Sequence, residues 1–151
     1  MAQTFTGVDE VVHAVGTQLG ETEWLEITQE QVNQFADATG DHQWIHVDVD
    51  RATKGPYAGT IAHGYLTLSL IARFGEELFS VNGVTAKLNY GVNKVRFPAP
   101  VPVGSRVRAS ASIAGAQETP AGAQVSLQWV IELEHSTKPA CVAETVVLLV
   151  R

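Results

Sequence analysis

The feature of this sequence that most limits its possible folds is an apolar helical segment near the middle of the chain. The segment begins at His63-Gly64, and its apolar side chains cover nearly every face of its first turns; they are Tyr65, Leu66, Leu68, Leu70, Ile71, Phe74 and Leu78. A helix that is apolar all round in a water-soluble protein usually lies buried in the core. We therefore expect the rest of this short chain to wrap around the segment.

The second half of the chain has the alternation of long antiparallel strands. Apolar and polar residues alternate over residues 106–113 and again, with one exception at Val130, over residues 125–134. Between these runs, Thr119-Pro120-Ala121-Gly122 is a suitable hairpin connection. Residues 86–97 form a further expected strand, which the following prolines close at a sheet edge or a bend.

The first half of the chain is expected to be helical. Val8 to Val15 have helical spacing, residues 23–27 alternate as a short strand would, and a capping-box pattern begins at Thr28. The helix that follows Thr28 is expected to end at Gly40, and residues 41–60 have the composition of a loop.

Helices followed by strands predict an α+β protein. A buried helix wrapped by one long curved antiparallel sheet is the hot-dog arrangement, and we expect a single domain of this kind over residues 1–151. The sheet edge that such a domain leaves is commonly paired, so we expect a homodimer formed through the sheet edges.

Charge and cysteine content exclude several classes of protein. A net charge of −6 argues against nucleic-acid binding and against a polybasic membrane anchor, and no apolar run is long enough to cross a membrane. The first six residues lack a signal-peptide pattern. Cys141 is the single cysteine, which suits a reducing cytoplasm, and its alternating surroundings favour a structural strand residue over a nucleophile.

The fragment from Gly40 to Asp48 carries the strongest chemical signal. Asp41 and His46 are five residues apart in an expected non-helical turn, so that both side chains can converge on one water. Trp44 and Ile45 beside them are apolar, which favours shifted pKa values. The alternative is a turn aspartate and a structurally satisfied histidine.

Zinc ligation is a second alternative for this fragment, with His42, His46 and Asp48 as ligands and His63 as an optional fourth. A His-x-x-x-His pair ligates zinc best on a helix, and we expect Gly40 to have ended the helix. We therefore expect no metal.

Gly64 stands where the apolar helix begins. The first amides of a helix have no partner inside it, and together with the helix dipole they favour an oxygen that gains negative charge. A thioester carbonyl that becomes an enolate is such an oxygen. Close packing of the helix on the sheet would explain the glycine equally well.

Three fragments together resemble the MaoC-like, (R)-specific enoyl-CoA hydratases, and most closely their short one-domain actinobacterial members. The fragments are residues 35–52, Ala62-His63-Gly64, and residues 96–104. Departures from the family pattern are Gln43-Trp44, where the family usually has Asn-Pro, and Ala38, where it has a branched aliphatic residue or glycine.

The resemblance implies a trans-2-enoyl-CoA substrate, a (3R)-hydroxyacyl-CoA product, and no metal or organic cofactor. It places Asp41 and His46 on the catalytic water and the Gly64 N–H on the thioester oxygen. Further residues are assigned to substrate binding, with the two basic ones as candidates for the CoA phosphates: Gln43, His63, Tyr65, Lys94 and Arg96. The rival functions are an acyl-CoA thioesterase, a dehydratase acting on acyl-carrier-protein substrates, and a non-catalytic acyl-CoA-binding module.

Overall fold

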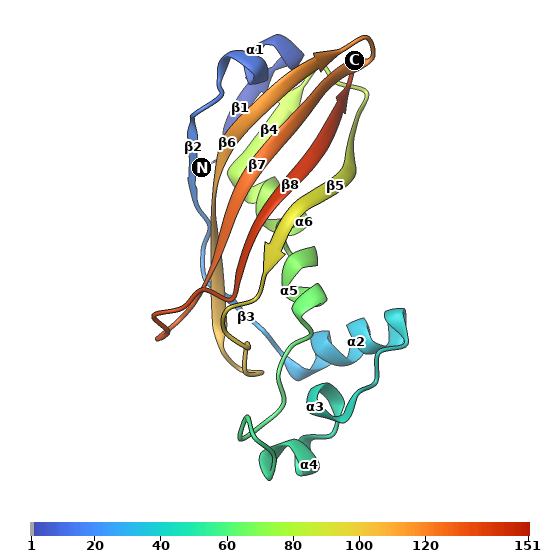
Figure 1. Ribbon diagram of the computed structural model, residues 1–151, viewed down its shortest axis with the longest axis vertical. Coiled ribbons are helices and arrows are strands. Elements are labelled where there is room, and N and C mark those ends of the chain that lie inside the picture. Colours follow the sequence, from blue (N-terminus) through green and yellow to red (C-terminus); the bar gives the residue numbers. More distant parts are fainter. Residues whose placement is uncertain (1) are drawn as a thin grey trace.

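The computed structural model describes residues 2–151, in which an antiparallel sheet curves around two consecutive helices (Figure 1). The strands of this sheet follow the order β2-β6-β7-β8-β5, and β3 also pairs with β6. Their bounds are β2 (Gln18–Glu21), β3 (Leu25–Glu26), β5 (Ala86–Arg96), β6 (Arg106–Thr119), β7 (Gly122–Leu133) and β8 (Cys141–Val150). The predicted α+β class and hot-dog arrangement are therefore confirmed.

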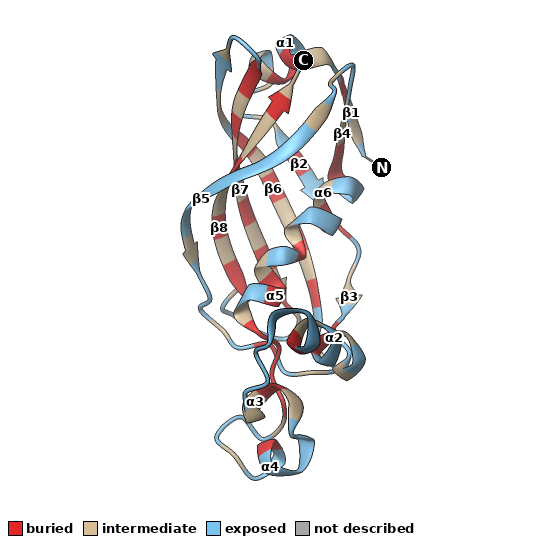
Figure 2. Ribbon diagram, turned by 90° about the vertical axis from the view of Figure 1, so that its right-hand side faces the viewer, coloured by how far each residue is buried: buried red, intermediate tan, exposed pale blue. Residues whose placement is uncertain are grey.

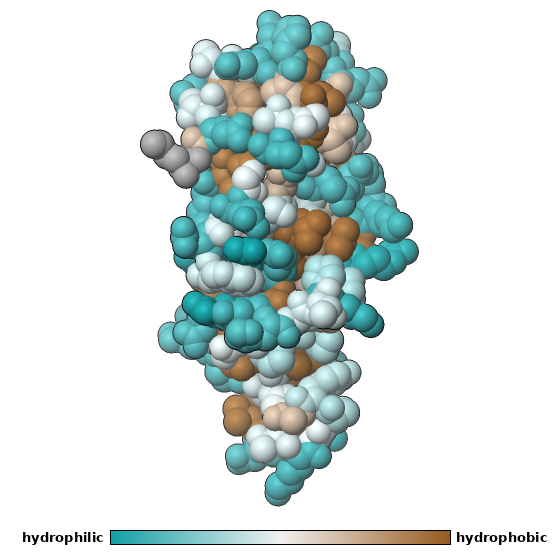
Figure 3. All heavy atoms as spheres, turned by 90° about the vertical axis from the view of Figure 1, so that its left-hand side faces the viewer, coloured by the Kyte–Doolittle hydropathy of each residue, from teal (hydrophilic) through white to brown (hydrophobic). Residues whose placement is uncertain are grey.

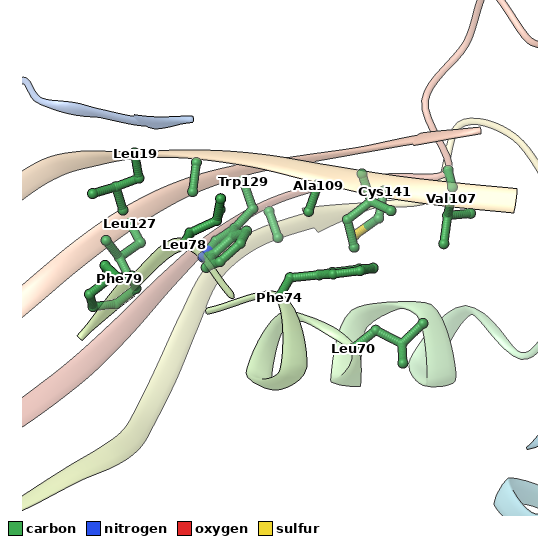
Figure 4. Packing of buried hydrophobic residues seen from close by; sticks show 14 of the residues in the cluster. Leu19, Leu70, Phe74, Leu78, Phe79, Val107, Ala109, Leu127, Trp129 and Cys141 are labelled. Carbon is green, nitrogen blue, oxygen red and sulfur yellow. The ribbon is translucent and has the colours of Figure 1, made fainter. Parts of the chain in front are cut away.

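As predicted from the sequence, the alternating apolar residues of β6 and β7 point into the core. Ala111 of β6 pairs with Trp129 of β7, and the inward residues of both strands are buried. The connection is the two-residue turn Pro120-Ala121. Trp129 and Phe74 are both fully buried in this core (Figure 4). Each fully buried large apolar side chain of this kind contributes roughly 1.5–3 kcal/mol to folding.

Cys141 lies in this core with no exposed surface, at the start of β8. Burial raises the pKa of its thiol to about 11. A thiol with such a pKa stays protonated and unreactive near neutral pH. The structural interpretation of Cys141 is therefore confirmed.

The apolar segment forms two short helices, α5 (Gly64–Ser69) and α6 (Ile71–Leu78), with Leu70 between them. Only the side toward the sheet is buried, as at Leu66 and Phe74, whereas Tyr65 is 73% exposed. The expectation that the segment is buried on nearly every face is wrong for the single chain. The reason is visible in Figure 2, where the sheet covers one side of α5 and α6 and leaves the other open.

The helix predicted after Thr28 is α2 (Gln29–Thr39), and both of its ends are as predicted. Thr28 Oγ1 accepts a hydrogen bond from Gln31 N at 3.1 Å, and Gly40 ends the helix in the left-handed conformation with φ of 81°. Val32 and Ala36 are fully buried on its inner face.

Residues 41–60 are not the simple loop that the composition suggested. They contain α3 (Trp44–Val47) and α4 (Val49–Thr53). Asp48 caps α4, because its carboxylate accepts a hydrogen bond from Arg51 N at 3.1 Å. Aspartate is favoured both in loops and at helix N-caps, and Asp48 is an N-cap in this structure. Figures 1 and 2 show α2, α3 and α4 together at one end of the sheet.

The N-terminal part of the chain differs in detail from the sequence-based expectation. The first helix is α1 (Gly7–His13), so Val15 lies outside it. Two short parallel strands, β1 (Gln3–Thr6) and β4 (Phe79–Asn82), were not predicted. The strand expected over residues 23–27 is shorter in the structure, where it is β3. Just before it, Thr22 Oγ1 accepts a hydrogen bond from Ala109 N at 2.9 Å, where a regular strand would use a backbone carbonyl.

The surface opposite to that of Figure 2 is covered mostly by hydrophilic residues, with hydrophobic residues in small patches (Figure 3). None of the helices in residues 2–151 is long and apolar enough to cross a membrane.

Candidate active site

The end of α2 and the turn of α3 bring Asp41 and His46 to the same place. Gly40 turns the chain directly before Asp41, whose side chain is 52% exposed. His46 lies on α3 and is 6% exposed. The two residues therefore face each other from opposite environments, a carboxylate open to water and an imidazole in the interior.

The His46 ring is held in one orientation by a backbone carbonyl. Its Nδ1 lies 2.7 Å from Ile61 O, and because a carbonyl oxygen only accepts, Nδ1 carries the proton that is donated. Nε2 of the neutral ring therefore has the free lone pair. Burial is the main reason why the pKa of His46 is lowered, so the neutral form is favoured.

Gln29 fixes the backbone of the same residue. Its Nε2 donates to His46 O at 2.8 Å, and its Oε1 accepts from Thr60 Oγ1 at 2.6 Å. The start of α2 is thus tied both to α3 and to the segment that leads into α5. These bonds set the position of His46 relative to the central helices.

His63 completes the cluster. Its ring stacks on that of His46, with the centroids 3.8 Å apart and the planes 24° apart. One carboxylate oxygen of Asp41 and one ring nitrogen of each histidine lie within 4.8 Å of one another. His63 directly precedes α5, so Asp41 and His46 meet beside the N-terminal end of the central helices, which is the geometry that the sequence-based hypothesis requires.

The stacked arrangement is unfavourable for a metal ion. Ring nitrogens coordinate through lone pairs that lie in the ring plane, at about 2.0–2.1 Å from zinc. The nearly parallel planes of His46 and His63 direct these lone pairs side by side instead of toward one point. The other two residues of the zinc set have different partners, since His42 pairs with Asp37 at 2.9 Å and Asp48 caps α4.

A cavity of about 370 Å³ adjoins the cluster. His46 and Gly64 both line it, together with Tyr57, Thr67 and Phe97. Gly64 is the first residue of α5, and within residues 2–151 its N–H has no hydrogen-bond acceptor. A Cβ on Gly64 would lie 3.2 Å from the Phe97 ring. The glycine therefore serves close packing and at the same time leaves a free amide at the cavity.

The sequence matches the family described as the MaoC like domain over residues 10–129. The chain belongs to the MaoC-like family. It is 53% identical over 146 residues to 3-hydroxyacyl-thioester dehydratase Z of Mycobacterium tuberculosis (strain ATCC 25618 / H37Rv), an alignment that covers 96% of this chain and 97% of the relative. It is 39% identical to nodulation protein N of Rhizobium leguminosarum bv. viciae, with 93% and 89% covered.

A solved structure agrees with these relatives. The (R)-hydratase from A. caviae involved in PHA biosynthesis superimposes with a TM-score of 0.73 at 25% identity, over 89% of this chain and 96% of that one. The MaoC-like chain is thus an enzyme of the hydro-lyase type, as the sequence predicted.

Not all residues assigned to substrate binding lie near the cluster of this MaoC-like chain. Gln43 is exposed beside Asp41, and Tyr65 is exposed with its ring 6.4 Å from that of Phe97. Lys94 and Arg96 line a different pocket, formed by β5, β7 and β8. The structure of one chain therefore does not bring these two basic residues together with His46.

Sequence reasoning missed several supporting groups. The Ile61 carbonyl and the Gln29 side chain contact His46 only because the chain folds, and no local sequence pattern predicts such contacts. Phe97 stands within the Arg-Phe-Pro fragment already singled out, but its contact with Gly64 comes from distant parts of the chain. His63 was assigned to the substrate, whereas it is 2% exposed and contacts His46 and Asp41.

Proposed function

We propose that this MaoC-like enzyme adds water across the double bond of trans-2-enoyl-CoA thioesters to give (3R)-hydroxyacyl-CoA, and catalyses the reverse dehydration. The observation that carries the proposal is the convergence of Asp41 and His46 beside the cavity that Gly64 lines. Support comes from the similarity to 3-hydroxyacyl-thioester dehydratase Z and to an (R)-hydratase.

The proposed chemistry uses Asp41 and His46 as one unit. They hold a water whose oxygen forms a bond to C3 of the enoyl group while one of its protons passes to the pair. The pair returns a proton to C2, so that one water is added in all. Only Nε2 of His46 is free for this exchange, because Nδ1 is bonded to Ile61 O. The two groups titrate together, and acid and base are assigned to the pair.

The amide of Gly64 has the second role. When water attacks C3, negative charge develops on the thioester oxygen, and a donor that is already in place stabilises it without reorganisation. A single well-placed donor of this kind lowers a barrier by on the order of 3 kcal/mol. The scheme uses no metal and no organic cofactor, and coenzyme A is part of the substrate.

The acyl chain is proposed to lie beside the central helices. A cavity of about 240 Å³ separates α6 from the sheet, and its lining includes Ile71, Gly75, Phe79 and Trp129. The apolar part of this lining suits an alkyl chain, whereas Glu76 and Lys87 form a charged part of the same lining.

We further propose that two copies pair through β5. This strand is at one end of the sheet order and is exposed along nearly its whole length (Figure 2). It carries Leu88 at 50%, Tyr90 at 64% and Val92 at 46% exposure. An unpaired edge with large apolar side chains favours association, and a second copy would also cover the open side of α5 and α6.

Light scattering of the purified protein tests the pairing. We expect twice the chain mass of 16.2 kDa for the natural sequence and a shift toward the single-chain mass for Leu88→Glu, because the charge would be buried at the interface. Val49→Glu is the matched control, since Val49 is 51% exposed on α4. A natural protein with the mass of one chain would refute the pairing.

The proposed reaction is tested with crotonyl-CoA, followed as loss of the enoyl absorbance. Saturated acyl-CoA with a thiol reagent runs in parallel. We expect hydration without thiol release. Thiol release from the saturated thioester would instead indicate a thioesterase, and a ligand that binds but stays unchanged over hours would indicate a non-catalytic binding module.

A further inference from the structure

His63 occupies an enclosed position behind the acid/base pair. Its side chain is 2% exposed and lies between two aromatic rings, with His46 at a centroid distance of 3.8 Å and Phe35 at 4.9 Å. Its Nε2 lies 2.9 Å from Asp41 O. A group so placed contacts both members of the pair and has almost no surface to offer a substrate.

The two members depend on His63 to different degrees. His46 has other anchors, since Ile61 O lies 2.7 Å from its ring and Gln29 Nε2 lies 2.8 Å from its carbonyl oxygen. Asp41 is exposed, and its other contacts are long: its N–H reaches Thr39 Oγ1 at 3.3 Å, and its Oδ1 accepts from Gln43 N at 3.4 Å. The bond from His63 is therefore the strongest constraint on the position of Asp41.

We propose that His63 is a positioning residue, which holds Asp41 through its Nε2–H and fixes the ring plane of His46 by stacking. The proposal rests on the proposed function, because it concerns the pair that performs the hydration.

The chemistry of imidazole explains why a histidine suits both tasks. A carbonyl oxygen only accepts hydrogen bonds, so Nε2 must carry the proton that reaches Asp41 O. Phenylalanine would preserve the flat ring against His46 but has no donor. Glutamine would place an amide N–H near the position of Nε2 but has no ring. The Nδ1 atom of His63 is buried without a hydrogen-bond partner in the described part of the chain. Only the Nε2 atom and the face of the ring therefore act on Asp41 and His46.

The two substitutions separate the two tasks when the crotonyl-CoA kinetics are measured. We expect His63→Phe to lower kcat by about 100-fold, the loss typical of a catalytic group misplaced by 1 Å, with KM changed by less than about threefold. We expect His63→Gln to lower kcat by only about tenfold, because it keeps the donor to Asp41. Each variant is first checked by its melting curve.

A second readout does not depend on activity. The pKa of His46 is lowered mainly by burial, and the neighbouring His63 lowers it further, whereas Asp41 and the hydrogen bond to Ile61 O raise it. With a neutral residue at position 63, we expect the His46 ring resonances to titrate at higher pH in both variants. His42→Gln is the control, because His42 is exposed and paired with Asp37, and it should leave kcat and the His46 titration unchanged.

The possible outcomes are distinct. Full kcat in His63→Phe, or in His63→Gln if the phenylalanine variant does not fold, together with an unchanged His46 titration, would overturn the positioning role. A natural protein that fails to hydrate crotonyl-CoA would overturn the proposed function instead, and the His46 titration would then decide on His63 alone.

Discussion

Asp41→Asn and His46→Gln are each expected to lower the rate of crotonyl-CoA hydration by about 10²–10⁴-fold, the range that a positioned acid or base contributes. Asparagine and glutamine keep a polar group near the water but cannot take up or return its proton. The initial rate of enoyl absorbance loss measures the effect. KM should change little, since neither residue is proposed to hold the CoA portion of the substrate.

The double variant sharpens this test. Because Asp41 and His46 act on one water, removal of both should cost little more than removal of either, as for groups that act as a unit. His42→Gln, one residue after Asp41, serves as the control and should keep the natural rate. Well-folded Asp41→Asn and His46→Gln proteins with full activity would exclude the proposed mechanism.

Gly122→Ala is expected to produce the largest loss of stability from a single methyl group. Gly122 begins β7 beside the end of β8, and a Cβ there would lie 1.8 Å from Leu149 O. This atom belongs to the backbone and cannot rotate away, so the strand ends must separate. We expect unfolding to become easier by about 3 kcal/mol, the upper range for overpacking. For a chain of this size the melting temperature would fall by about 6–12 °C.

Gly115→Ala is the matched control in the same sheet. Its Cβ would lie 4.0 Å from the nearest atom, Ser126 Cβ, which is an ordinary contact. The melting temperature of this variant should stay within about 2 °C of the natural one, as for substitutions away from special features. Equal melting temperatures for the two variants would show that the strand ends accommodate the methyl group at position 122.

The parts of the fold that could be predicted from sequence are those in which one pattern dominates. The alternation around Ala111 and Trp129 specified the buried faces of β6 and β7, and the side chain of Thr28 fixed the start of α2. Short elements such as β1 and β4 pair across 76 positions of the chain, as Ser80 with Thr4, and a local pattern does not contain such a contact.

The candidate site shows the same division. Asp41, His46 and Gly64 stood out because acidic, imidazole and glycine residues at this spacing match a known chemistry. Their supports were hidden, because the Ile61 carbonyl exists in every sequence and the stacking of His63 requires that two distant segments meet. Lys94 and Arg96 were chosen by charge alone, and charge does not reveal that β5 carries them to another pocket.

The groups that organise the reaction centre come from four consecutive residues. Ile61 supplies the carbonyl that orients His46, His63 contacts Asp41, and Gly64 offers its amide to the cavity. A tetrapeptide that leads into a helix moves as one piece, so a small translation of α5 along the sheet would carry all three groups together. The size of the cavity beside Gly64 could then diverge among homologues while the mutual arrangement of these three groups stayed constant.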